Sequence, residues 1–184
     1  MKNLIFLSGS LLLLCMLPVR LIGEPDMNKN NVQLVEQVDL NRYVGLWYEI
    51  AKIPNRFQKQ CVKNTTAQYA IRSDGRIDVV NRCMKENGFF DEAKGIAKIV
   101  DQVSHAQLKV SFVHIFGIYL FWGNYWIIGL DNDYQWAVVG EPTRKYGWVL
   151  GRSTALSDNQ WENVHAVLLK NGYNPDDFVK TEHD

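Results

Sequence analysis

The chain lacks any block of like charge. Its 184 residues include 20 Lys and Arg and 20 Asp and Glu, so the formal net charge is zero. Affinity for nucleic acid comes from clustered Lys and Arg side chains that neutralise phosphates. The missing cluster therefore argues against a nucleic-acid partner.

Long hydrophobic runs are also scarce, and the longest one is too short to span a bilayer. It covers residues 4–17, follows the basic start Met1-Lys2-Asn3, and precedes Pro18 and Arg20. A bilayer span needs roughly 18 to 20 apolar residues. We therefore interpret residues 1–23 as an export signal.

Two positions compete for the end of this signal. A lipoprotein signal would end just before Cys15 and leave that cysteine acylated, although Leu14 is larger than the residue that usually precedes such a site. The rival is cleavage near Gly23. Residues 24–37 are polar and unpatterned, so we interpret them as a tether. Residues 38–184 suffice for one domain with a sizeable core and are too few for two.

Cysteine and histidine are few. The chain has three cysteines and four histidines, without an H-E-x-x-H or C-x-x-C arrangement. We therefore expect no zinc site, and nothing in the sequence points to another metal or cofactor. Beyond the leader only Cys61 and Cys83 remain, and two cysteines in an exported chain indicate a disulfide between them.

What the sequence does contain is a series of strand patterns, beginning with the aromatic segment at residues 45–54. Turn signals such as Asp74-Gly75 and Asn87-Gly88 separate the strands, and no helical period lies between them. Short antiparallel strands with short connections predict an all-β up-and-down meander that closes into a barrel to remove its edges. The eight expected strands cover residues 45–54, 64–72, 76–83, 92–100, 108–112, 124–130, 135–140 and 146–152.

The periodicity changes only after the last of these strands. Ser157 and Gln160 have the spacing of a capping box, in which each side chain bonds to the other residue's backbone. Trp161, Val164, His165 and Leu168 then recur at helical spacing, and Gly172 is a typical terminator. We expect one C-terminal α-helix.

Three separated segments resemble the three conserved regions of the lipocalins. They are Asp39-Leu40-Asn41-Arg42-Tyr43 with Gly45-Leu46-Trp47-Tyr48, then Leu130-Asp131-Asn132-Asp133-Tyr134, and finally Leu150-Gly151-Arg152-Ser153. Residues 47–54 and 78–81 are most similar to the bacterial branch of outer-membrane lipoproteins, which also resembles apolipoprotein D. The resemblance implies an eight-stranded barrel with a helix outside. It also implies that Arg152 lies across Trp47 at the closed end, as a structural pair without a catalytic role.

Side-chain parity then predicts the lining of the lumen. Side chains alternate across a strand, so taking Trp47 and Arg152 as inward, with the family register, sets the inward face of each strand. Ile71 and Cys83 have the same inward parity. The predicted lining is mostly apolar, which suits a ligand with a hydrocarbon body and one polar or anionic head. The candidate ligand-binding residues are Tyr69, Asn81, Lys85, Val110, Phe112, Tyr125, Ile127, Ala137, Val139, Tyr146 and Trp148.

The leading functional hypothesis is a non-enzymatic binding protein. The resemblance implies storage or transport of fatty acids or lysophospholipids at the bacterial cell envelope, for membrane maintenance, in the periplasm or at the outer membrane. One alternative is an isomerase-like enzyme that uses Cys83 as a barrel cysteine. Another is a module whose aromatic loop 116–122 contacts a protein, the membrane surface or a second copy of the chain. A third is a lumen filled by its own side chains.

Overall fold

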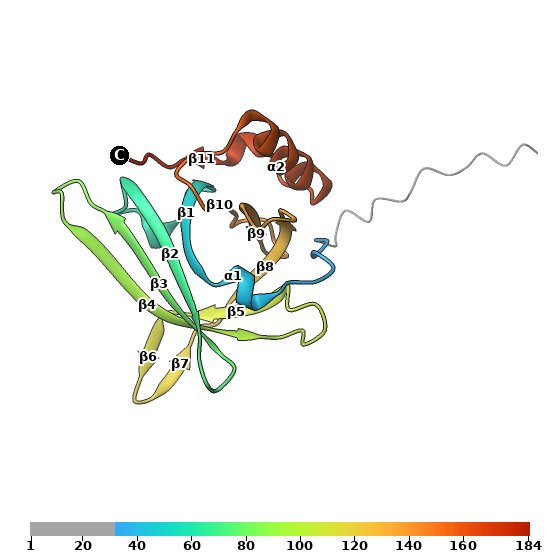
Figure 1. Ribbon diagram of the computed structural model, residues 1–184. Helices are drawn as coiled ribbons and strands as arrows, with labels where there is room; N and C mark the ends of the chain where they lie inside the picture. Colours follow the sequence, from blue (N-terminus) through green and yellow to red (C-terminus); the bar gives the residue numbers. More distant parts are fainter. Residues whose placement is uncertain (1–31) are drawn as a thin grey trace, which may run out of the picture.

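The computed structural model describes residues 32–184, which form a closed antiparallel barrel with one helix outside (Figure 1). The predicted barrel is thereby confirmed. Eight strands form its wall in chain order, and β1 closes the ring by pairing with β10. The wall strands are β1 (Gly45–Lys52), β2 (Lys63–Ile71), β3 (Ile77–Met84), β4 (Phe90–Ile99), β5 (Gln107–Ser111), β8 (Gly123–Leu130), β9 (Trp136–Gly140) and β10 (Trp148–Gly151).

Three short segments outside the wall were not anticipated. The hairpin of β6 (Val113–Ile115) and β7 (Ile118–Leu120) is a separate two-stranded sheet between β5 and β8. Two 3₁₀ turns, η1 (Arg56–Gln58) and η2 (Pro175–Asp177), follow β1 and α2. η1 lies at the open end of the barrel, because it joins the end of β1 to the start of β2. The β6–β7 hairpin leaves the wall between β5 and β8 and projects away from it, in another direction than the β3–β4 turn (Figure 1).

Arg152 holds the closed end of the barrel together. Its guanidinium lies 3.8 Å from the centroid of the Trp47 ring and bonds to four backbone carbonyls, those of Arg42, Tyr43, Val44 and Leu46, at 2.7 to 3.0 Å. Three of these carbonyls belong to the short helix α1 (Leu40–Tyr43) and its C-cap. The Trp47 indole also donates to the Tyr43 carbonyl, at 2.7 Å. Arg152 therefore fastens α1 across the end of the barrel.

The C-terminal helix α2 (Asp158–Lys170) packs on the outside of the wall, and its predicted start is confirmed. Both bonds of the Ser157–Gln160 capping box are present, and Gly172 follows the helix at φ +72°. Val164 and Leu168 are fully buried in an outer core. This core includes Ile50, Ala51, Ile128, Trp136, Val138, Val149 and Tyr173.

The C-terminal segment fills a gap in the wall between β1 and β2. These strands pair over Gly45–Tyr48, after which a bulge between Glu49 and Ala51 turns β1 away. The two-residue strand β11 (Val179–Lys180) pairs with Ala51 and Lys52, and the Glu182 carbonyl accepts from the amide of Asn64 at the start of β2. The last residues of the chain thus complete the wall at its open end.

Part of the expected tether packs on the barrel. Residues 32–37 fall in the expected tether, yet Val32 is buried in the outer core and the Val35 amide donates to the Ile127 carbonyl at 3.0 Å. The apolar residues of that segment are Val32, Leu34 and Val35, and each packs on the barrel. The export signal, the candidate lipidation site Cys15 and the rest of the tether lie outside the described residues.

Arg152→Ala should lower the free energy of unfolding by about 1 to 3 kcal/mol, because it uncovers Trp47 and releases four carbonyls. Urea unfolding measures this loss. Arg152→Lys should recover only part of the lost stability, because an ammonium group lacks the planar set of N–H donors of a guanidinium. Ligand affinity should persist in both variants, since the pair lies at the closed end. Unchanged stability with lost affinity would contradict this assignment.

Candidate ligand-binding lumen

Three tyrosines meet at the closed end of the lumen. The Tyr125 hydroxyl lies 2.8 Å from that of Tyr43, on α1, and 3.1 Å from that of Tyr69, on β2. Burial raises the pKa of Tyr69 to about 12 and also raises those of Tyr43 and Tyr125, because a phenolate there would lose its hydration. The three hydroxyls therefore stay neutral well above neutral pH, and they bond to one another.

Apolar side chains surround the tyrosines. Among the predicted lining residues, Ile127, Ala137 and Val139 are fully buried in the inner core, and Val110 and Trp148 pack against it partly buried. The other buried members of this core are Val38, Trp47, Ala67, Ile77, Val79, Ala97, Ala106, Leu108 and Leu150. Ile71, which was also expected inside, is exposed, because β2 has reached the closed-end turn at that residue.

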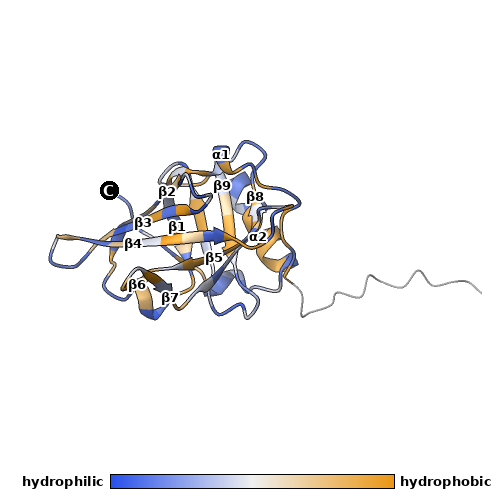
Figure 2. Cartoon of the chain, turned by 90° about the horizontal axis from the view of Figure 1, so that it is seen from below, coloured by the Kyte–Doolittle hydropathy of each residue, from blue (hydrophilic) through white to orange (hydrophobic). Residues whose placement is uncertain are grey.

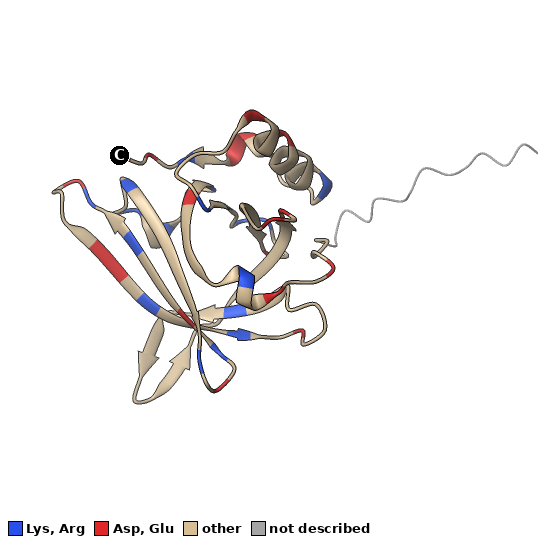
Figure 3. Ribbon diagram, in the orientation of Figure 1, with Lys and Arg blue, Asp and Glu red and all other residues tan. Residues whose placement is uncertain are grey.

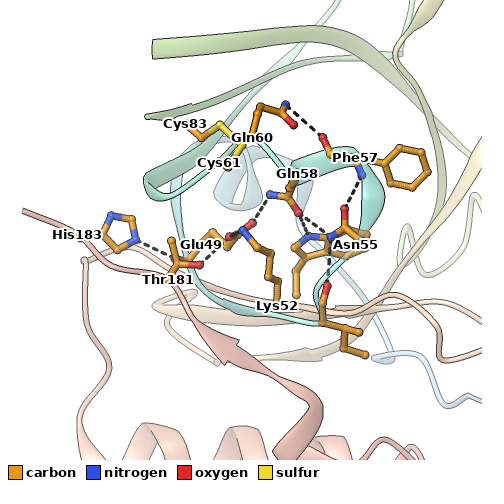
Figure 4. Close-up of polar contacts among 12 residues, drawn as sticks. Glu49, Lys52, Asn55, Phe57, Gln58, Gln60, Cys61, Cys83, Thr181 and His183 are labelled. Carbon is orange, nitrogen blue, oxygen red and sulfur yellow. Dashed lines mark hydrogen bonds and ion pairs between the residues drawn. A yellow bond between two sulfur atoms is a disulfide. The ribbon is translucent and has the colours of Figure 1, made fainter. Parts of the chain in front are cut away.

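Gln58 of η1 lies across the open half of the lumen. Its Oε1 accepts from the Trp148 indole at 3.0 Å and from Asn55 at 2.9 Å, and its Nε2 donates to Glu49 at 2.6 Å (Figure 4). Tyr146 stacks on Trp148 with centroids 6.3 Å apart. The predicted residues Tyr146 and Trp148 therefore lie beneath η1, which partly covers them.

Glu49 carries a buried negative charge on the lumen side of β1, and sequence reasoning missed it. Its side chain accepts from Lys52 and Thr181, both at 2.7 Å, in addition to Gln58, and the residue is only 3% exposed. The alternation of side chains along β1 could have identified Glu49, because it points to the same face as Trp47. Lys52 shares that face only because the β-bulge changes the alternation.

Two buried oxygen atoms on neighbouring strands have no hydrogen-bond partner. They are Asn81 Oδ1 on β3 and Thr65 Oγ1 on β2. Asn81 lies directly opposite Ala67, and Thr65 is two residues from Ala67 on the same inward face. A buried polar atom without a partner costs about 1 to 3 kcal/mol. These two atoms are therefore the strongest local indication of a polar group that belongs in the lumen. Asn81 was a candidate from the sequence, whereas Thr65 was not.

The mouth residues lie differently from the sequence expectation. Lys85 is half buried and forms an ion pair with Asp91, with 3.6 Å between Nζ and Oδ1, so its charge is already compensated. Phe112 lies over Gly95, where an added Cβ would come within 2.6 Å of the Phe112 ring, and its outer edge is exposed. Phe112 therefore lies at the edge of the lumen, where Gly95 provides the space for its ring.

The predicted disulfide is confirmed. Cys61 and Cys83 are bonded, with their Cα atoms 5.4 Å apart, so the end of the η1 loop is fastened to β3 at the open end (Figure 4). Within residues 32–184, no group of three or more His, Cys, Asp or Glu side chains is arranged to hold a metal ion. In the same part of the chain, no helix is long and apolar enough to cross a membrane.

Comparison with known proteins identifies the fold's family. The family described as the lipocalin-like domain matches residues 38–183, which is most of the barrel and its outer helix. The chain belongs to the lipocalin family. Membership supports the binding of small hydrophobic ligands and fits a role without catalysis.

This lipocalin has relatives in bacteria and in animals. Outer membrane lipoprotein Blc of Escherichia coli K12 is 36% identical over 149 residues, which cover 80% of this chain and 81% of Blc. Apolipoprotein D of Mus musculus is 29% identical over 155 residues, covering 80% and 78%. Both resemblances expected from the sequence are confirmed. Insecticyanin from Manduca sexta shares the fold, with a TM-score of 0.68 at 23% identity over 84% of this lipocalin and 85% of insecticyanin.

Two hollows lie on the outer surface of this lipocalin rather than in its lumen. One, of about 350 Å³, is lined by Tyr48, Asn64, Thr66, Arg82, Phe90, Thr154, His183 and Asp184. The other, of about 290 Å³, is lined by Asp158, Trp161, His165, Leu168, Pro175, Phe178 and Lys180. Each contains charged side chains of both signs, so neither resembles the apolar lumen.

The buried tyrosines should make stability fall at alkaline pH. An unfolded chain releases tyrosine protons near pH 10, whereas the folded chain keeps those of Tyr43, Tyr69 and Tyr125 to higher pH. Their contribution is complete below pH 10 and is lost as the pH rises through the folded pKa values. Phenolate absorbance at about pH 11 should therefore be lower for the folded chain than for the chain in urea. Equal absorbance would contradict the buried cluster.

Proposed function

We propose that this lipocalin binds a single-chain lipid, a lysophospholipid or a fatty acid, in the open half of its lumen. The observation that carries the proposal is the pair of unpartnered oxygens, Asn81 Oδ1 and Thr65 Oγ1, in an otherwise apolar lining. The acyl chain would lie against Val110, Ile127 and Val139. Binding requires Gln58 to move away from Trp148, so η1 acts as the cover that a ligand displaces.

The polar atoms favour a ligand with a hydrogen to donate. Asn81 Oδ1 can only accept, and a hydroxyl or an ammonium group would satisfy it. A deprotonated carboxylate has no such hydrogen and would also approach Glu49, whose charge only Lys52 offsets at close range. We therefore expect a lysophospholipid, with its glycerol hydroxyl, to bind more tightly than the fatty acid of equal chain length.

Location follows from the proposed signal and from the relatives. The Blc proteins are named as outer membrane lipoproteins. An export signal at residues 1–23 would bring this lipocalin to the same compartment, where lysophospholipids and fatty acids arise from membrane turnover. The competing thiol enzyme has less support, because Cys83 is bonded to Cys61 and a disulfide has no thiolate to react.

Lysophospholipid added below its critical micelle concentration should quench tryptophan fluorescence with micromolar or lower Kd. Each buried methylene contributes about 0.8 kcal/mol before the losses from ordering, so a long chain reaches this range. Trp148→Phe should remove most of the quenching. The matched control, Trp161→Phe on the outer helix α2, should leave the quenching intact. Absence of quenching, together with no lipid in organic extracts of the purified protein, would overturn the proposal.

Head-group preference tests the polar pair separately. Asn81→Leu should weaken lysophospholipid binding by about 5- to 20-fold, which corresponds to one lost hydrogen bond of about 1 to 2 kcal/mol, and should affect the fatty acid less. Lys85→Ala should change either affinity by less than about 3-fold, because Lys85 is paired with Asp91 and half exposed. A larger loss of affinity in Lys85→Ala than in Asn81→Leu would indicate instead that the head group lies at the mouth.

A further inference from the structure

The β6–β7 hairpin exposes apolar side chains that the barrel does not need. It is a separate sheet that projects from the wall (Figure 1), and most of its length is hydrophobic (Figure 2). Phe116 at its tip is 100% exposed, Phe121 is 82% exposed and Ile118 is 62% exposed. Apolar groups gathered on one projection are typical of a contact surface rather than of a solvated turn.

The hairpin is an ordered element. Val113 pairs with Leu120, and Ile115 pairs with Ile118. Ser111 bonds to the Leu120 carbonyl, and the Trp122 indole donates to the Tyr119 carbonyl at 3.1 Å. The exposed side chains therefore occupy defined positions.

The turn at its tip has an unusual residue at its first central position. Phe116 and Gly117 both have positive φ, at 48° and 83°, as the two central residues of a tight hairpin turn. Asn, Asp or Gly is usual at the first of these positions, because a large side chain is strained there. Turn formation thus does not account for Phe116, whose ring the turn presents entirely to the outside.

The side chains change in character from the tip to the base. Residues 112–122 contain no Asp, Glu, Lys or Arg, so this part of the ribbon carries no charge colour (Figure 3). Phe116 and Ile118 form the tip, Tyr119 and Trp122 follow, and the Lys98 ammonium lies 4.3 Å from the Trp122 ring centroid. This order matches the layers of a bilayer. The apolar tip corresponds to the acyl chains, the amphipathic aromatic rings to the interface, and the cation to the phosphates.

Other exposed aromatics lie at the open end of the barrel, and one leads into the lumen. Phe57 in η1, together with Phe89 and Phe90 beside the β3–β4 turn, is exposed. Phe57 contacts Tyr146, with centroids 5.7 Å apart, and Tyr146 stacks on Trp148 in the lumen. An apolar path therefore connects the open-end surface to the proposed binding site.

We propose that the β6–β7 hairpin docks on a lipid bilayer, with Phe116 and Ile118 inserted among the acyl chains and Lys98 at the phosphates. The inference rests on the proposed function for its purpose, since docking would keep the lumen beside the bilayer that supplies its lipid. A second copy of the chain fits less well. The two hollows described above contain Arg82 and Asp184 or Asp158 and Lys180, so neither offers an apolar recess for the hairpin.

Vesicle flotation tests this docking, with Cys15→Ser in every sample of the full chain so that no acyl anchor can form. Vesicles of phosphatidylcholine with one fifth phosphatidylglycerol should carry the protein. Phe116→Ser with Ile118→Ser should reduce the bound fraction at least tenfold. The matched control is Val103→Ser, which removes an apolar side chain of similar exposure, 83%, from a closed-end loop and should bind as the parent does.

Brominated acyl chains give a second measurement of the same contact. They should quench part of the tryptophan fluorescence of vesicle-bound protein, and Trp122→Phe should remove that part. Equal flotation of the double variant and the parent, or no flotation of the parent, would overturn the docking proposal. The docking proposal would also be overturned if the parent were a dimer and the double variant a monomer, because a second copy of the chain would then cover the hairpin.

Failure of docking is distinguishable from failure of the lumen proposal. Quenching by monomeric lysophospholipid involves no vesicle, so the double variant should retain it with an unchanged Kd. Vesicle binding without lysophospholipid quenching would support docking and reject only the lumen site.

Discussion

The pairing of β1 on both of its sides determines the rest of the structure. At its start β1 pairs with β2, and along its second half it pairs with β10, which closes the ring. The bulge after Glu49 turns the strand away from β2 and makes room for β11 and the residues that follow it. The β1–β10 pairing therefore closes the barrel, and the bulge brings Lys52 to the inner face on which Glu49 lies.

The lumen has two parts with different roles. At the closed end, Arg152 fastens α1 and the tyrosine hydroxyls satisfy one another, so little is left there to attract a ligand. Towards the open end, the hydrogen bonds from Gln58 to Trp148 and Glu49 hold η1 over the mouth, and Asn81 and Thr65 remain unsatisfied. Stability is thus concentrated at one end, and the polar groups without partners are left to the other. A cover held by a few side-chain hydrogen bonds can be displaced, whereas the closed end cannot open without loss of the fold.

The exposed aromatic side chains lie in two places. Phe57 is at the open end, where the disulfide keeps the η1 loop beside β3, and the β6–β7 hairpin projects from the wall (Figure 1). Exposed apolar area reduces solubility, so a chain that retains it on a barrel with an apolar lumen has a use for it. The hairpin and the lumen are best understood together, as a surface and a compartment for molecules of the same chemical class.

The sequence by itself determined the barrel, the outer helix, the disulfide and the family, because these depend on local signals. Strand alternation, Asp-Gly and Asn-Gly turns, the Ser157–Gln160 capping box and two lone cysteines can each be interpreted without knowing what lies across the molecule. Tertiary structure decided the interior of the site. Lys52 faces inward only through a bulge, Gln58 reaches the lumen from a loop, and Thr181 arrives from the far end of the chain. Parity made Lys85 a candidate, but its pairing with Asp91 depends on the adjacent strand. Parity assigns a face, whereas hydrogen bonding and charge compensation depend on neighbours that are distant in sequence.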